Sequence, residues 1–280
     1  MTGLVARALP WRLSPQSLSW FARHELLLAW RDWLSMMTAG RRTRERVMIA
    51  VAVGFVAGLH ALAYSILAPA LGSGAAANDK MLLVTVACAV LLAFFMMLSQ
   101  ALESVTRAFY TRSDLELILS SPSSPRHVFA VRIAALTLTT TVMATMLMAP
   151  FINVAAWIDG PAWLAAYPVL VVVAMIATGI AVWLMMVLFR LIGAARTRLV
   201  AQIVAAVIGA SFLIGIQVIG ILFYNNLSRL AVLQDHAVVA ALPAPDSLVW
   251  LPVWAAMGYT PALLAVVAIA LAFLGLTIWQ

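Results

Sequence analysis

The sequence has few charged residues: only 10% of its 280 residues are Asp, Glu, Lys or Arg, whereas 65% are hydrophobic. A soluble domain averages about 25% charged and about 45–50% apolar residues. The mean hydropathy, +1.05, is correspondingly high. This composition excludes an ordinary soluble enzyme or binding domain. It predicts an all-α protein that crosses the membrane several times as a bundle of helices.

Cysteine and lysine each occur once, as Cys88 and Lys80. A single cysteine can form neither an intrachain disulfide nor a Cys-based metal site, and we interpret Cys88 as a small core residue. A phosphate-binding loop of the G-x-x-x-x-G-K-[ST] type needs a lysine in that context, and Lys80 in "ANDKMLL" does not supply it. If ATP drives this protein, another polypeptide must bind it, and we expect no cofactor in this chain.

Ionisable side chains are almost missing from the apolar runs, with His60 as the main exception. Membrane enzymes and ion-coupled carriers keep such groups at membrane depth. A lone histidine in an apolar helix is more often a hydrogen-bonded structural residue than a proton relay. The absence of paired His, Asp or Glu argues against a membrane enzyme acting on lipids, and we expect no catalytic activity.

The long apolar runs predict where the chain crosses the bilayer, which takes about 20 residues per helix. We expect the second of these helices to continue past the headgroups to about Tyr110. The pattern predicts about six spans, at 47–69, 81–102, 133–157, 162–189, 199–224 and 261–279.

The distribution of basic residues predicts the orientation of these spans. Of the 17 Lys and Arg, all except Lys80 and Arg229 precede span one, lie between spans two and three or lie between spans four and five. The positive-inside bias therefore places both termini in the cytoplasm. Because the basic residues gather on one side of the predicted spans, we expect them to contact membrane lipids and not nucleic acid.

Two segments outside the spans carry tryptophans. Residues 16–37 predict an amphipathic helix lying in the membrane interface, with a solvated helix packed on a partner as the alternative. Residues 225–260 predict a short element around Pro252 that is either re-entrant or a plain interfacial anchor. The apolar stripe of the first segment consists of Trp20, Leu27, Trp30, Leu34 and Met37.

Uncharged polar residues within the spans allow two interpretations. Hydroxyl and amide side chains join helices by packing and hydrogen bonding, which is the simpler interpretation. The sharper one is a weakly polar substrate path, for which we single out Thr137, Thr141, Asn153 and Gln217.

The loop between spans two and three, 107–127, overlaps the stretch "RSDLELILSSPSSPRHVFAVR" at residues 112–132. Ser113 and Glu116 fit a capping box, which predicts a helix starting at Ser113. Leu115, Ile118 and Leu119 then share one face. Pro122 ends this helix, and Pro125 in the first turn begins the next. Two acidic residues fit poorly beside anionic lipid, which favours a protein receptor for this apolar face over a helix lying on the headgroups.

The stretch "FYTRSDLELILSSPSSPRHVFAVR" resembles the loop after the second span in membrane subunits of ATP-binding-cassette exporters of the type-2 permease class. In that family an amphipathic elbow helix precedes six spans, and a coupling helix in this loop docks on a separate ATPase subunit. The resemblance implies a permease subunit of the bacterial inner membrane, paired with a second permease half or with a second copy. The coupling helix would comprise Ser113, Asp114, Leu115, Glu116, Leu117, Ile118 and Leu119.

On this view residues 1–46 form the cytoplasmic segment with the elbow helix, and residues 47–280 form the transmembrane domain. Two features depart from the family pattern: there is no large folded domain before the last span, and no basic residue follows the apolar "LGLTIWQ". The second feature predicts that a longer permease continues from here. The competing function is a passive membrane scaffold or assembly factor, which would use the loop 107–127 as a static docking site.

Overall fold

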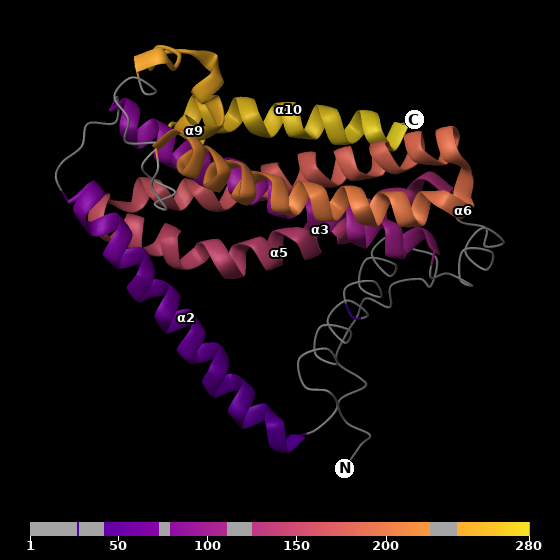
Figure 1. The fold of residues 1–280 in the computed structure, drawn as a ribbon, viewed down its shortest axis with the longest axis horizontal. Coiled ribbons are helices and arrows are strands. Elements are labelled where there is room, and N and C mark those ends of the chain that lie inside the picture. Colours follow the sequence, from indigo (N-terminus) through magenta and orange to yellow (C-terminus); the bar gives the residue numbers. More distant parts are fainter. Residues whose placement is uncertain (1–26, 28–41, 73–78, 111–124, 225–239, 280) are drawn as a thin grey trace, which may run out of the picture.

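The computed structural model describes Leu27 and residues 42–72, 79–110, 125–224 and 240–279 of the chain. Within these ranges the regular structure is helical throughout, without a strand. Most of the helices run roughly parallel or antiparallel to one another (Figure 1). The helices are α2 (Arg42–Leu71), α3 (Lys80–Tyr110), α5 (Pro125–Asp159), η2 (Pro161–Ala165), α6 (Ala166–Tyr224), η3 (Leu248–Trp250), α9 (Leu251–Ala256) and α10 (Thr260–Trp279).

Five helices of the described chain are long and apolar enough to cross a membrane, which identifies the protein as a membrane protein. They coincide with five of the six predicted spans. The remaining prediction, 199–224, falls in the second half of α6, which is helical; its role as a sixth span stays a prediction. The five segments are Ala50–Pro69, Lys80–Tyr110, Val128–Asp159, Pro161–Gly193 and Thr260–Trp279.

Two helix boundaries follow the sequence signals closely. Helix α3 continues to Tyr110, as predicted. Helix α5 begins at Pro125, whose fixed φ suits the first turn and whose missing N–H is not needed there.

Helix α2 begins at Arg42, before the predicted span, because its first charged residues continue the helix beyond the apolar run. The predicted interfacial helix 16–37 lies outside the described residues except for Leu27, which is helical.

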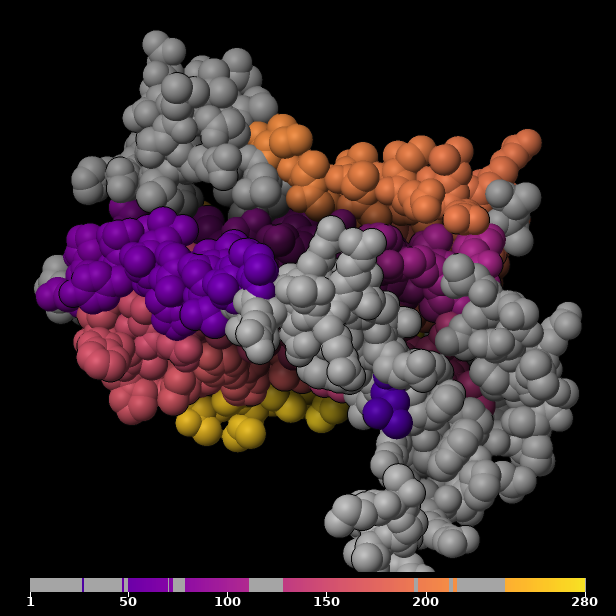
Figure 2. Space-filling model, turned by 90° about the horizontal axis from the view of Figure 1, so that it is seen from below, coloured from indigo at the N-terminus to yellow at the C-terminus, as the bar shows by residue number. Residues whose placement is uncertain are grey.

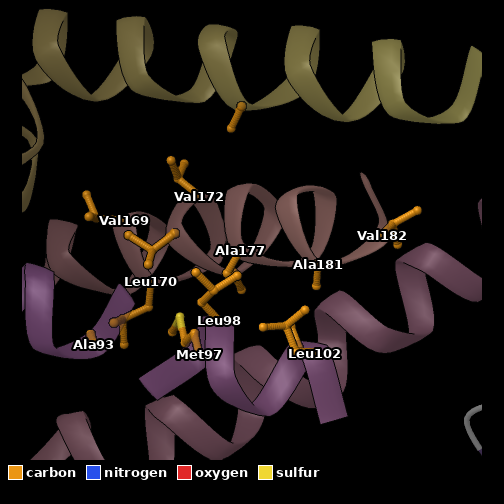
Figure 3. Packing of buried hydrophobic residues seen from close by; sticks show 14 of the residues in the cluster. Ala93, Met97, Leu98, Leu102, Val169, Leu170, Val172, Ala177, Ala181 and Val182 are labelled. Atoms are coloured by element: carbon orange, nitrogen blue, oxygen red, sulfur yellow. The ribbon is translucent and has the colours of Figure 1, made fainter. Parts of the chain in front are cut away.

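The core of the bundle lies between α3 and the first half of α6. Met97, Leu98 and Leu102 of α3 face Ala177 and Ala181 of α6 (Figure 3). These alanines let the helix backbones approach closely, which is how helices associate in a medium as apolar as their own side chains. Of the apolar window in Pro161–Gly193, 61% is buried by other parts of the protein. The first half of α6 is therefore the central helix of the bundle.

Helix α2 lies at the periphery. Only 6% of its apolar window is buried, and Figure 1 shows it diverging from the bundle along its length. It packs against α5, and Figure 2 shows the two in contact on one face of the molecule. Ala63 is its fully buried residue in this contact region. Most of its apolar surface is consequently left for lipid or for another protein.

Helix α6 is broken at Gly193, whose φ of 72° and ψ of 166° are not helical. Glycine adopts this positive φ without the steric cost that a Cβ would add. The chain doubles back there (Figure 1). The second half then meets α3, where Ser99 Oγ donates a hydrogen bond of 2.8 Å to the carbonyl of Ala205. A Cβ on Gly209 would lie 2.8 Å from the same Ser99 Oγ, so the two backbones are close.

The segment before α10 packs part of its surface against the bundle. Trp250, Val253 and Ala255 of η3 and α9 are buried, and α9 packs against α3, α6, η2 and α10. Trp250 Nε1 donates a hydrogen bond to the carbonyl of Ala244 at 3.1 Å. Leu248 and Val249 beside it are 82% and 67% exposed. Both alternatives for this segment, a re-entrant element and a plain interfacial anchor, therefore stay predictions.

Candidate functional site

The residues of the predicted coupling helix, Ser113 to Leu119, lie outside the described residues. The structure does describe both ends that hold this loop: the last turns of α3, ending at Tyr110, and the first turns of α5, starting at Pro125. We call these two ends, together with the α6 residues that contact them, the loop frame. Its geometry determines where a force applied to the loop would go.

Arg132 joins the two sides of the loop frame. It lies in the second turn of α5, and its Nη2 donates a hydrogen bond of 2.8 Å to the carbonyl oxygen of Ala108 in the last turn of α3. The last carbonyls of a helix have no partner within the helix and carry its partial negative charge. The guanidinium of Arg132 therefore donates to a carbonyl that has no partner within its helix, and it places positive charge at the negative end of the helix dipole. The guanidinium is half-buried, which strengthens the interaction.

An aromatic contact fixes the same end of α3 to α6. The ring of Phe189 lies 5.5 Å from that of Phe109 in an edge-to-face arrangement, and 5.9 Å from that of Tyr110. Such pairs contribute about 0.5–1.5 kcal/mol beyond the area they bury. The end of α3 is thus attached to two different helices immediately before the loop begins.

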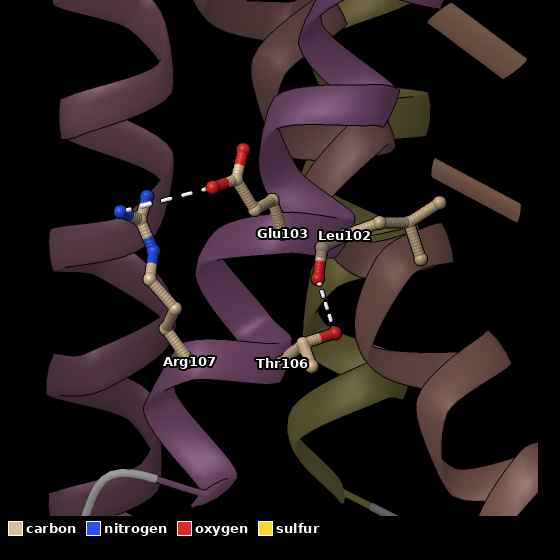
Figure 4. Close-up of polar contacts among 4 residues, drawn as sticks. All are labelled: Leu102, Glu103, Thr106 and Arg107. Carbon is tan, nitrogen blue, oxygen red and sulfur yellow. Dashed lines mark hydrogen bonds and ion pairs between the residues drawn. The ribbon is translucent and has the colours of Figure 1, made fainter. Parts of the chain in front are cut away.

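The preceding turn of α3 has a polar and a buried side (Figure 4). Arg107 and Glu103 form an ion pair of 3.8 Å, with both side chains more than half exposed. Such an exposed pair contributes less than about 1 kcal/mol. On the buried side, Thr106 Oγ1 donates a hydrogen bond of 2.7 Å to the carbonyl of Leu102. Because Val105 and Thr106 in this turn are buried, packing against the bundle holds the turn more firmly than the exposed ion pair does.

The predicted substrate-path residues are spread along the bundle. Thr141 Oγ1 donates to the carbonyl of Thr137 at 2.8 Å, within α5. Asn153 is exposed and accepts a hydrogen bond of 2.8 Å from the hydroxyl of Tyr167 in α6. It lies about 18 Å from Thr141 along the helix axis. Gln217 is in the second half of α6, and its side chain is outside the described part. The bonds that are described join helix to helix or side chain to its own backbone.

Three buried threonine hydroxyls have no hydrogen-bond partner among the described residues: Thr137 and Thr140 of α5 and Thr178 of α6. A buried hydroxyl without a partner costs free energy relative to one that is bonded. Among the described side chains of the predicted path, Thr137 is therefore the one with an unused polar group inside the protein. The sequence marked Thr137 through its threonine cluster but contained no signal for Thr178, which stands alone in an apolar run.

Sequence reasoning missed the contacts of the loop frame. Arg132 was counted only for topology, and Phe189 lies in an apolar run with nothing to distinguish it. In the described part of the chain no three His, Cys, Asp or Glu residues lie close enough to hold a metal ion. Comparison with known proteins identifies no relative: no family model, no curated protein and no solved structure matches the chain significantly.

Proposed function

We propose that this chain is the permease subunit of an ATP-driven exporter, coupled through loop 107–127 to a separate nucleotide-binding ATPase subunit. In this proposal the protein has six spans with both termini on the cytoplasmic side of the bacterial inner membrane. It acts with a second permease half or a second copy. Closure of two ATPase subunits on ATP moves the coupling helices, and the spans then open outward.

The loop frame is the observation that supports this proposal. A loop that only filled the gap between two spans would need no attachment at its ends. Here the end of α3 is bonded to α5 through Arg132 and stacked on α6 through Phe189. A displacement of the loop would therefore be delivered to three helices together. One of them, α6, is the central helix of the bundle.

The position of α2 is compatible with such a movement. Among the described residues it contacts the bundle mainly through α5, and only 6% of its apolar window is buried. The helices of the loop frame can therefore change their tilt relative to α2 without disrupting a large buried interface. The resemblance of loop 107–127 to a coupling loop remains the reason for assigning an ATPase as the partner.

Substitutions on the apolar face of the predicted coupling helix test the proposal. We expect Leu115→Ala to weaken docking of the ATPase by about 2–4 kcal/mol, because a buried leucine side chain is removed from a groove. Ile118→Ala should act similarly, whereas Ser113→Ala should cost about 1 kcal/mol through loss of the helix cap. The measurements are co-purification of an ATPase with the tagged full-length chain and ATP-dependent transport in membrane vesicles.

Leu117→Ala is the matched control, because Leu117 lies on the opposite face of the same predicted helix. It should leave both readouts close to those of the wild type. Wild-type transport in Leu115→Asp, which places a charge in the middle of the apolar face, would refute coupling through this loop. If Leu115→Ala loses co-purification while the wild type shows no ATP-dependent transport, the passive scaffold is favoured instead.

A further inference from the structure

The turn of α6 around Gly193 carries a cluster of positive charge. Arg190, Arg196 and Arg198 are all exposed. None of them makes a hydrogen bond or ion pair within the part of the chain that the structure describes. No Asp or Glu occurs anywhere in α6. The positive charge of this turn is therefore not neutralised by its own helix.

Apolar side chains are exposed between these arginines. Leu191 is 74% exposed and Leu199 is 64% exposed, and Ile192 also reaches the surface. A site that only contacted water would not favour leucine at these positions. The combination of long cationic and apolar side chains matches the boundary between phosphate groups and acyl chains, where arginine stems lie along apolar surface and the guanidinium reaches the headgroups.

The turn has a defined backbone on which these side chains are presented. Gly193 interrupts the helix with its positive φ. Four residues later, the buried Thr197 donates a hydrogen bond of 2.8 Å from Oγ1 to the carbonyl of Gly193. Because the apolar segment Pro161–Gly193 ends at this turn, the arginines lie where a spanning helix leaves the hydrocarbon. The contact of Phe189 with Tyr110 places the turn at the same end of the bundle as the loop frame.

We propose that the turn 190–199 is a binding site for anionic phospholipid, in which the three arginines contact the headgroup phosphate and the two leucines contact the acyl chains. Among the described residues no carboxylate pairs with these arginines, which leaves them open to an anion. The exposed leucines support lipid over an acidic protein surface, which would not need the apolar side chains. This inference is independent of the transport function, since it requires only that the bundle lies in a membrane.

The test is native mass spectrometry of the purified full-length chain titrated with phosphatidylglycerol or phosphatidylcholine. The wild type should bind phosphatidylglycerol more tightly, and added salt should reduce this preference. The variant R190Q/R196Q/R198Q should lose roughly a hundredfold in phosphatidylglycerol affinity, at about fivefold per arginine. Its affinity for phosphatidylcholine should not change.

Two further variants distinguish a lost site from a misfolded protein. R190K/R196K/R198K keeps the charge and should retain most of the phosphatidylglycerol affinity. R107Q removes an arginine that is paired with Glu103 at the same end of the bundle, and should change that affinity less than twofold. Unchanged phosphatidylglycerol affinity in the glutamine variant would overturn the proposal. Equal affinities of the wild type for the two lipids would also overturn it. If, in that case, the wild type but not the glutamine variant retained an acidic protein, the turn would be a protein contact.

Discussion

At the scale of single residues, two glycines with positive φ differ in how closely they are packed. Gly258 and Gly160 both have positive φ, 96° and 108°. A Cβ on Gly258 would lie 2.8 Å from both the Cβ and the carbonyl oxygen of Ala162, whereas a Cβ on Gly160 would have no neighbour within 4 Å. Gly258 is therefore required twice, by its conformation and by the approach of α9 to the turn between α5 and α6.

We expect Gly258→Ala to lower the stability of the protein more than Gly160→Ala does. Both variants incur backbone strain of about 1–3 kcal/mol, and Gly258→Ala adds about 1–3 kcal/mol of overpacking. Thermal unfolding in detergent can be followed with a thiol-reactive dye, since the half-buried Cys88 is the one cysteine of the chain. Equal losses for the two variants would contradict the close contact with Ala162.

Arg132 offers a second test at this scale. Arg132→Gln should loosen the last turn of α3, because a hydrogen bond from a charged donor contributes about 1.5–3 kcal/mol. Hydrogen exchange of the amides of residues 104–110 should accelerate. Arg107→Gln is the control on the same turn, since its ion pair with Glu103 is exposed and should contribute less than about 1 kcal/mol. Similar exchange in both variants would mean that Arg132 does not hold the loop frame together.

At the scale of elements, α2 shows how little contact a spanning helix needs with its own bundle. Ala63 has no exposed surface, whereas Val51, three turns earlier, is 67% exposed. Among the described residues the helix is therefore attached near one end, and the rest of its apolar surface is left for lipid or for another protein. Its attachment depends on a small residue that lets α2 approach its neighbour.

We expect Ala63→Leu to detach this end of α2, at a cost of about 1–3 kcal/mol from overpacking. Ala52→Leu makes the same substitution at an exposed position of the same helix and should have no effect. The readout is hydrogen exchange across residues 60–71, which should accelerate only in the first variant. Unchanged exchange in Ala63→Leu would show that the contact adapts to the larger side chain.

At the scale of the whole molecule, the distribution of charge predicts the orientation of the bundle. In a Cys88→Ala background, cysteines at Ser123 or Ala195 should react with an impermeant reagent only after the cytoplasmic side is opened. Cysteines at Ser73 or Gln234 should react from outside. The reason is that basic residues in short loops resist translocation. Labelling of Ser123→Cys in intact cells would show that the orientation is the reverse of the predicted one. If Ser73→Cys and Gln234→Cys are both labelled from outside, the chain between them must cross the membrane an even number of times.

The sequence by itself determined the class of the protein and most of its helices. Five predicted spans appear as helices, α3 runs to Tyr110, and α5 starts at Pro125. These features depend on neighbouring residues: the length of an apolar run sets the length of a span, and proline suits a helix start. The same local signals predict a capped helix at Ser113 in the loop 107–127, which stays a prediction because it lies outside the described residues.

The tertiary structure alone decided which side chains face protein and which face the membrane. Trp157 is 88% exposed and Trp163 only 9% exposed, although both lie near the same turn. The contacts of Arg132 with Ala108 and of Asn153 with Tyr167 were equally invisible in the sequence. The physical reason is that hydropathy measures the cost of leaving a residue in water. It does not distinguish lipid from another helix as the surroundings that replace water, and only the packing of the helices makes that choice.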